Sequence, residues 1–407
     1  MNQTINSRMA GIAHSLTNYP PTVEPTLVEE NKKEFLNDIE NLIINIRREH
    51  KNFDLDSWKS CNNLNRKTEK EIFILLSEQY NRNLIGHNKC LSLLDKSSPL
   101  IKNNYSNKNY PTDSLSDFFS EVKQSIIVGK NDYLDVLKTI FSNYMEYIRG
   151  LREKLTSIGK YTKAGDKDGT LSVNFCDFRL ELENFKKEYN EKLKDEKFFY
   201  IEMLFVSENK GSYSRKIDKQ KIFYKNKEQI NSAISVMEKF LKEIKGIKVE
   251  KSGKDMNFNF IGSIEFADFD KFINMIKEKE SKEKKLTEEE LQQKRKDYIK
   301  DLKDDFFYKM SYGMTKKILE QSFEAQADEK MKEWRKENDE KVMSHILQTE
   351  FDLFKKSLDA LEKKMNTNLD ELSKKYSSAN SNYDNFVKIV SSSMNTLLEM
   401  AKGFLRF

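Results

Sequence analysis

The C-terminal residues 351–407 read FDLFKKSLDALEKKMNTNLDELSKKYSSANSNYDNFVKIVSSSMNTLLEMAKGFLRF, without proline and with a single glycine, Gly403. Apolar residues recur in this stretch at steps of three and four, at positions Phe351, Phe354, Leu358, Leu361, Met365, Leu369, Leu372, Tyr376, Ala379, Tyr383, Phe386, Val390, Met394, Leu397, Ala401 and Phe404. The mean step is about 3.5 residues, which is the period of a coiled coil. At 1.5 Å per residue the stripe is about 80 Å long. A helix with such a stripe needs a partner helix.

The best partner within the chain is the segment 115–158. Asp113 or Ser114 offers an N-cap for this helix, and Gly159 offers a stop. Its apolar positions are Leu137, Ile140, Tyr144, Ile148, Leu151, Leu155 and Ile158. We expect the seam between the two helices to include Leu137, Ile140, Tyr144, Leu151, Leu372, Tyr376, Tyr383, Phe386 and Val390. The alternative is two separate amphipathic helices in a globular bundle.

The remaining segments complete a mainly α fold. Residues 1–28 are polar and contain three of the five prolines, which predicts a disordered arm. Two apolar stripes predict a helical hairpin over 29–104. We therefore expect a long intramolecular antiparallel coiled coil, formed by 113–160 and 341–407, with that N-terminal hairpin and a small mixed α/β distal domain over 161–340.

The segment 161–340 alternates between patterns. Residues 198–206 and 221–224 are candidate strands, and residues 247–261 alternate like a β-hairpin. Helical patterns cover about 175–193, 230–244 and 264–276. Residues 277–305 contain ten basic and ten acidic residues, nearly all within i to i+4 reach of the opposite sign, so 277–338 is predicted as a solvated helical excursion.

Composition excludes several classes of protein. Lys and Arg number 71 against 66 Asp and Glu, so the net charge of +5 gives no single-sign field for nucleic acid. The densest apolar run, residues 198–206, is far shorter than the ~20 residues that cross a bilayer, and no Sec-type signal peptide is visible. We expect no stable membrane insertion and no nucleic-acid partner.

The chain also lacks the usual signatures of catalysis and metal binding. Three scattered cysteines form no disulfide framework, and the four histidines are isolated from one another. His87 and Cys90 have helical i, i+3 spacing but no second pair of metal ligands. Residues 165–169 (GDKDG) resemble the middle of an EF-hand loop without its anchoring acids, which favours a Gly/Asp turn. No phosphate-loop, dinucleotide or nucleophile-elbow motif is present, so we expect no enzyme, metal or cofactor.

The C-terminus carries a more specific signal. Residues 374–393 read KKYSSANSNYDNFVKIVSSS and the chain closes on Phe407. This region resembles the terminal helix of the type III secretion needle-tip proteins of the invasin D class, the group of the Shigella, Salmonella and Burkholderia tip proteins. Residues 132–189, the hairpin 247–261 and the helix 269–276 follow in that family's order. The chain departs from the family by extra residues around 198–224 and 277–338.

The resemblance implies a function in assembly rather than catalysis. Tip proteins are secreted through the type III apparatus and cap the needle at the bacterial surface, as a monomer in solution and a pentamer at the tip. They control secretion and recruit translocator proteins on host contact, and their N-terminal hairpin acts as a self-chaperone. A bile-salt ligand is an expectation from the family, without assigned residues.

Polar residues beside the seam are candidates for contact with the needle subunit or a neighbouring copy. They are Asn380, Ser381, Asp384, Asn385 and Lys388. The alternative for these positions is a solvated helix face. The alternative function is a secreted helical effector or pore-forming protein that acts on host membranes, and an enzyme with a site assembled from distant residues is the third hypothesis.

Overall fold

The computed structural model describes residues 25–55, 64, 67–103, 113–195, 197–208, 211–254, 256–283, 286–309 and 316–404. The chain divides into two compact units. Unit 1 comprises Met1–Tyr144, Phe198–Ile264 and Asn368–Phe407, and unit 2 comprises Met145–Lys197 and Glu265–Thr367. The segment 161–340, predicted as one mixed domain, is thus divided between the two units, and the other domain boundaries stay predictions.

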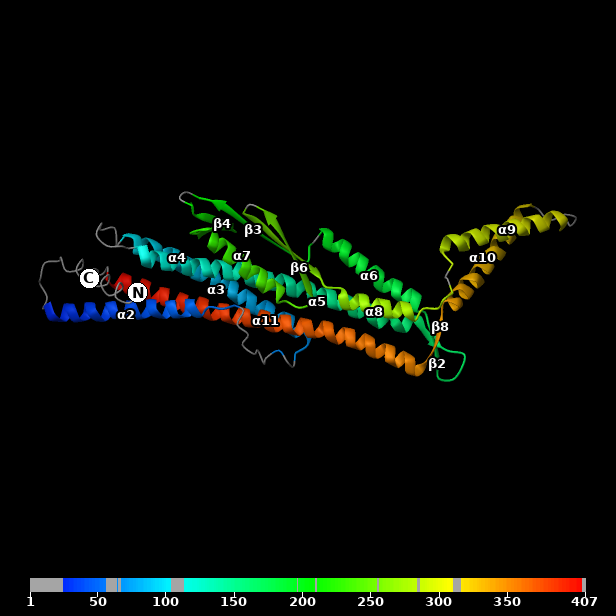
Figure 1. The fold of residues 1–407 in the computed structure, drawn as a ribbon, viewed down its shortest axis with the longest axis horizontal. Helices are drawn as coiled ribbons and strands as arrows, with labels where there is room; N and C mark the ends of the chain where they lie inside the picture. Colours follow the sequence, from blue (N-terminus) through cyan, green and yellow to red (C-terminus); the bar gives the residue numbers. More distant parts are fainter. Residues whose placement is uncertain are drawn as a thin grey trace. The chain divides into compact units, whose positions relative to one another are not determined.

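The helices of unit 1 follow the apolar stripes of the sequence (Figure 1). They are α2 (Pro25–Asn52), α3 (Glu69–Asn103), α4 (Asp113–Val128), a π-helical segment (Gly129–Leu134), the first part of α5 (Asp135–Thr156), α7 (Lys227–Lys242) and the last part of α11 (Gln348–Phe404). Helix α2 begins at Pro25, inside the segment 1–28 that was predicted as a disordered arm. Proline suits a helix start because its missing N–H has no partner there anyway. The rest of that arm lies outside the described residues.

Unit 1 also contains an antiparallel sheet in the strand order β5-β4-β3-β7-β6. Its strands are β3 (Phe199–Ser207), β4 (Tyr213–Ile217), β5 (Gln220–Tyr224), β6 (Ile247–Lys254) and β7 (Asn257–Ile264). Side chains alternate along β3, with Phe199, Ile201, Met203 and Phe205 buried. The predicted strands at 198–206 and 221–224 and the predicted hairpin at 247–261 are confirmed.

Unit 2 combines helices with a second, smaller sheet. It contains the last part of α5, a 3₁₀ turn (Ser157–Tyr161), α6 (Phe175–Asp195), α8 (Ala267–Glu278), α9 (Glu288–Lys309), α10 (Lys316–Lys341) and the first part of α11. Strands β1 (Thr162–Ala164), β2 (Thr170–Val173) and β8 (Ser344–Leu347) form the sheet in the order β1-β2-β8. The excursion predicted at 277–338 is the antiparallel pair α9 and α10, joined by Arg295 to Glu324 and Asp328.

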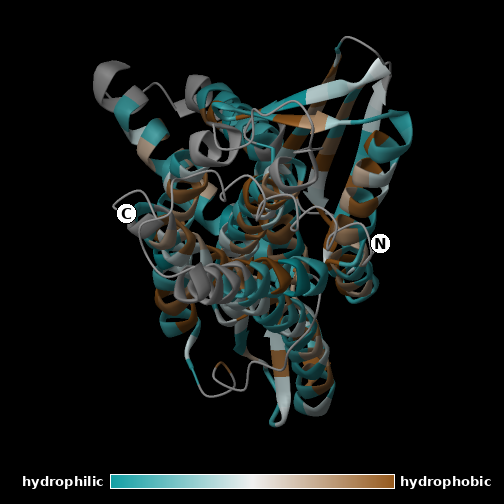
Figure 2. Cartoon of the chain, turned by 90° about the vertical axis from the view of Figure 1, so that its left-hand side faces the viewer, coloured by the Kyte–Doolittle hydropathy of each residue, from teal (hydrophilic) through white to brown (hydrophobic). Residues whose placement is uncertain are grey.

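The predicted class, mainly α with a small mixed part, is confirmed. Figure 2 shows polar (teal) and apolar (brown) residues along the same helices, as expected where each helix buries one face. The turn at 165–169 joins β1 to β2, where Gly169 has a φ of +75° that favours glycine. Among the described residues, none of the helices is both long and apolar enough to span a bilayer. That described part also holds no group of three or more His, Cys, Asp or Glu arranged to bind a metal.

Candidate assembly surface on helix α11

Helices α4, α5 and α11 form the spine of unit 1, a name used below for these helices with the intervening π-helical segment. Three contacts fix the direction of pairing. The Asn368 amide donates to the Tyr144 hydroxyl at 3.2 Å, and the rings of Phe141 and Tyr376 lie 6.0 Å apart. The Tyr383 hydroxyl donates to the carbonyl of Ile126 at 3.0 Å. Residue numbers rise along α11 while they fall along its partner, so the predicted antiparallel pairing is present.

The expected seam residues are buried in both units. In unit 1 this applies to Leu137, Ile140, Tyr144, Leu372, Tyr376, Tyr383, Phe386 and Val390. In unit 2 Leu151 is buried as well. The adjacent Arg152 also contacts α11, since it binds Glu362 at 2.7 Å and Asn366 at 2.9 Å. The stripe on α11 is buried at every position from Phe351 to Met394.

The π-helical segment gives the spine a local exception to regular helix geometry. A Cβ atom at Gly129 would lie 3.2 Å from the Tyr383 ring and 3.1 Å from the Phe53 ring. Glycine therefore lets both rings approach the backbone here. The same segment places the buried Asp132 toward β4, where Arg215 binds both of its carboxylate oxygens.

One stretch of the motif that carries the family resemblance is enclosed on all sides. Residues 375–380 of α11 (KYSSAN) are all buried, which a helix with a single partner could not achieve. Small Ser and Ala side chains leave room for neighbouring helices on several faces. The Lys375 ammonium lies 4.8 Å from the centre of the Phe240 ring on α7 and 3.4 Å from Glu243. Sequence reasoning missed this buried lysine because nothing local distinguishes it from the surface lysines.

The five candidate contact residues do not share one environment. Asn380 is only 1% exposed, so its expected place on the open face of α11 is wrong. Ser381, Asn385 and Lys388 are exposed. Asp384 is half-buried and accepts a bond of 2.5 Å from Lys388, one turn further along the helix. The open face of α11 in unit 1 thus includes Ser381, Asp384, Asn385 and Lys388.

Asn380 is covered by helix α3. The Asn83 amide donates to the Asn380 carbonyl at 3.0 Å and to its side-chain oxygen at 2.8 Å. One turn further along α3, His87 Nδ1 lies 2.6 Å from the Tyr383 hydroxyl. Because 297 residues separate Asn83 from Asn380, no local pattern reveals this contact.

Replacing Asn83 with alanine is expected to lower the free energy of unfolding by about 1–3 kcal/mol, because buried polar groups of Asn380 lose their partner. Urea denaturation followed by circular dichroism measures the change. The matched control is Arg82→Ala on the adjacent, exposed position of α3, for which we expect no measurable change. Equal effects of both variants would contradict the importance of this contact.

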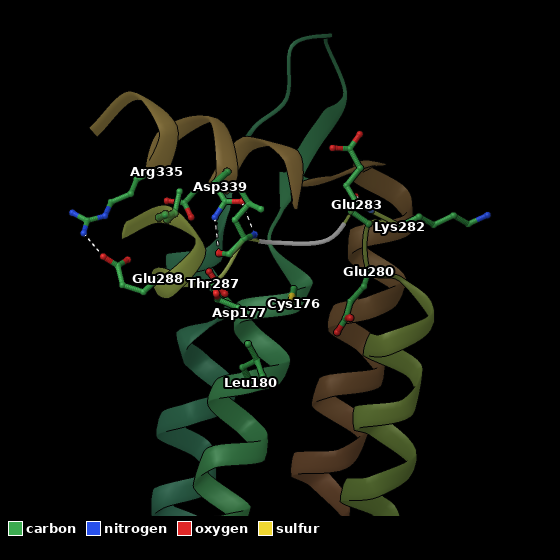
Figure 3. Close-up of a pocket in the computed structure, with 14 residues that line it drawn as sticks. Cys176, Asp177, Leu180, Glu280, Lys282, Glu283, Thr287, Glu288, Arg335 and Asp339 are labelled. Atoms are coloured by element: carbon green, nitrogen blue, oxygen red, sulfur yellow. Dashed lines mark hydrogen bonds and ion pairs between the residues drawn. The ribbon is translucent and has the colours of Figure 1, made fainter. Parts of the chain in front are cut away.

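Unit 2 contains a pocket of about 780 Å³ between the start of α6 and the base of α9 and α10 (Figure 3). Asn338 closes its base by binding the backbone N–H and carbonyl of Leu286 at 2.9 and 3.0 Å. The volume suits a small organic ligand. Its charged lining consists of Asp177, Glu280, Glu283, Glu288 and Asp339 against Lys282 and Arg335. Among the described residues the lining thus carries charges of both signs, and the bile-salt ligand stays an expectation without assigned residues.

Comparison with known proteins gives a family match that includes the α11 motif. Residues 339–405 match the model of the family described as type III secretion systems tip complex components. The resemblance to needle-tip proteins is confirmed. Over 47 residues the chain is 53% identical to the cell invasion protein SipD of Salmonella typhimurium and 51% identical to SipD of Salmonella typhi. Each match covers 12% of this chain and only 14% of the relative's length.

Solved structures of similar proteins include two of BipD from Burkholderia pseudomallei. One is 11% identical, covers 89% of this chain and 93% of that chain, and has a TM-score of 0.36. The other is 12% identical, covers 82% of each chain, and has a TM-score of 0.37. The family match therefore concerns the C-terminal helix, and the function of the whole chain is a separate question.

Proposed function

We propose that this chain is the needle-tip protein of a bacterial type III secretion system. The observation that carries the proposal is the tip-complex match over 339–405, because it falls on the end of α10, on β8 and on α11. In this proposal the protein is secreted through the apparatus and caps the needle at the cell surface. There it restrains secretion and recruits a translocator protein on host contact.

The structure supports an assembly function by its long paired helices. The antiparallel contacts between α5 and α11 make a stiff element, and a cap needs a surface that repeats between copies around the needle axis. We assign contact with the needle subunit or a neighbouring copy to Ser381, Asp384, Asn385 and Lys388. The proposed assembly is a monomer in solution and a pentamer at the tip.

Helices α2 and α3 are the proposed self-chaperone. Helix α3 covers Asn380 and Tyr383, and the Phe53 ring after α2 stacks on Phe386 with centroids 4.2 Å apart. These contacts shield polar and aromatic groups of α11 that lie beside the proposed contact face. A protein that must not assemble before export benefits from such a cover.

The direct test is antibody labelling of needle ends in bacteria that express this chain, together with secretion in a strain that lacks it. Labelled needle ends and uncontrolled secretion after deletion are expected. Needles without label would contradict the tip position. Leakage of liposomes by the purified protein alone would favour the alternative, an effector or pore-forming protein.

Reversing one charge on the contact face is expected to separate assembly from folding. Lys388→Glu should lower needle-end labelling at least about tenfold, since a lost charge-assisted contact costs 1.4 kcal/mol or more. The circular dichroism spectrum should not change, because Lys388 is exposed. Lys356→Glu, an exposed lysine on the same helix, is the matched control. If labelling with Lys388→Glu equals labelling with Lys356→Glu, the contact face lies elsewhere.

A further inference from the structure

Two of the chain's four histidines lie where α2 and α3 pack against the spine of unit 1. On α2, His50 Nε2 lies 2.8 Å from the Ser125 hydroxyl of α4, and its ring lies 6.0 Å from that of Phe386 on α11. On α3, His87 Nδ1 lies 2.6 Å from the Tyr383 hydroxyl of α11. Each helix of the N-terminal hairpin thus presents one histidine to the spine.

The hydrogen bonds around Tyr383 fix the proton on His87. The Tyr383 hydroxyl donates its only hydrogen to the Ile126 carbonyl at 3.0 Å, so its oxygen must accept from His87 Nδ1–H. The neutral ring therefore carries its proton on Nδ1, and acidification adds the second proton at Nε2. The charged imidazolium would form at a side chain of only 6% exposure.

Charged groups from three elements face His87. The pKa of His87 is lowered to about 4, mainly by burial and also by the positive charge of Lys130 in the π-helical segment. Asp135 of α5 and Asp218 of the β4–β5 turn act in the opposite direction. The carboxylate of Asp135 is already engaged by Lys130 at 2.8 Å and by the Tyr80 hydroxyl at 2.7 Å.

His50 has a similar but more open environment. Burial lowers the pKa of His50, and the charge of Glu121 on α4 partly opposes this shift. Arg47, one turn before it on α2, lies 4.8 Å from the centre of the Phe118 ring, which also contacts His50. From α11 the ring of Phe386 contacts His50. Protonation therefore places a cation in a mainly apolar contact.

We propose that acidification weakens the docking of α2 and α3 on the spine of unit 1. The reason is that His50 and His87 bind protons more readily after the helices have separated. This acid response goes beyond the proposed tip function and does not depend on it. A histidine that is neutral when docked binds its proton more readily once undocked, so docking weakens as the pH falls. The window runs from about 6.5, the ordinary value, down to about 4, below which the docked state also takes up the proton. For His87 alone the docking equilibrium changes about 20-fold between neutral pH and pH 5.

Hydrogen exchange of the full chain, read by mass spectrometry at pH 7.5 and pH 5, tests the proposal. Exchange rates are corrected for the intrinsic effect of pH, and peptides of α6 and α8 serve as the reference. Peptides of α3 and of residues 375–390 should exchange at least about tenfold faster at pH 5 relative to that reference. Unchanged relative protection would overturn the proposal.

Variants that keep the hydrogen bonds but cannot titrate make the test specific. In His87→Asn the amide nitrogen replaces Nδ1, and in His50→Gln it replaces Nε2. The double variant should lose the acid response, whereas His345→Asn on β8 should keep it. A double variant that responds like the unaltered chain would overturn the proposal.

Titration of the unaltered chain by NMR covers the case in which the double variant does not fold. Single variants assign the histidine ring signals. A pKa of 6 or higher for both His50 and His87 would refute the mechanism, and values clearly below 6 would support it. Normal needle-end labelling at neutral pH in the His87→Asn variant would show that tip function and the acid response are separate.

Discussion

Replacing Asp132 with alanine is expected to lower the free energy of unfolding by about 3–5 kcal/mol, the largest effect of any single charge removal in unit 1 that we predict. Asp132 and Arg215 are each 6% exposed, and one of their two bonds measures 2.5 Å and the other 3.0 Å. Without Asp132 the guanidinium of Arg215 would be left buried and charged. Burial acts to lower the pKa of Arg215, but the charge and hydrogen bonds of Asp132 outweigh it and leave that pKa raised.

Urea denaturation followed by circular dichroism measures this loss, and hydrogen exchange locates it in β4 and the π-helical segment. The double replacement of Asp132 with leucine and Arg215 with methionine should recover most of the stability, because no unpaired charge remains. Glu250→Ala removes one partner of the exposed pair with Lys248 and should have no measurable effect. A loss below about 1 kcal/mol for Asp132→Ala would mean that water reaches Arg215.

The long helices were predictable because their signal is repeated. The period on α11 recurs over many turns, so each of the positions between Phe351 and Met394 adds to the same prediction. The β6–β7 hairpin was predictable for a similar reason, since apolar residues alternate in both strands, although β6 continues through Gly253 to Lys254. In both cases the information lies close together in the sequence.

The short strands were not predictable from local pattern. Strand β2 pairs with β8, and the register places Ser172 opposite His345, 173 residues away. Strands of three or four residues are too short to show an alternation. Strand β4 was missed because Arg215 stands at a buried position where an apolar residue would be expected. Its partner, Asp132, is far away in the sequence.

The candidate site was predicted only in part, for one physical reason. The period of α11 identifies the face toward α5 but carries no information about a second covering helix. Asn380 therefore looked like a surface residue, although Asn83 of α3 covers it. Ser381, Asn385 and Lys388 lie outside the contacts of α11 with α5 and with α3. Their exposure agrees with the expectation that they flank the seam.

Replacing Phe354 with alanine is expected to be the most damaging change in unit 2, at about 3–5 kcal/mol of unfolding free energy. The ring is 1% exposed, and its centre lies 5.1 Å from that of Phe175 on α6 and 5.7 Å from that of Phe272 on α8. Truncation leaves a cavity and removes aromatic contacts to two helices at once.

The adjacent Leu353 gives the matched control, because it is 62% exposed on the same turn of α11. Leu353→Ala keeps helix propensity and removes almost no buried surface, so it should leave the denaturation midpoint nearly unchanged. Hydrogen exchange should show lost protection in α6 and α8 for Phe354→Ala alone. Similar losses for both variants would mean that the aromatic cluster does not hold α6 and α8 to α11. The apolar period of α11 would then predict the burial of Phe354 without explaining what stabilises unit 2.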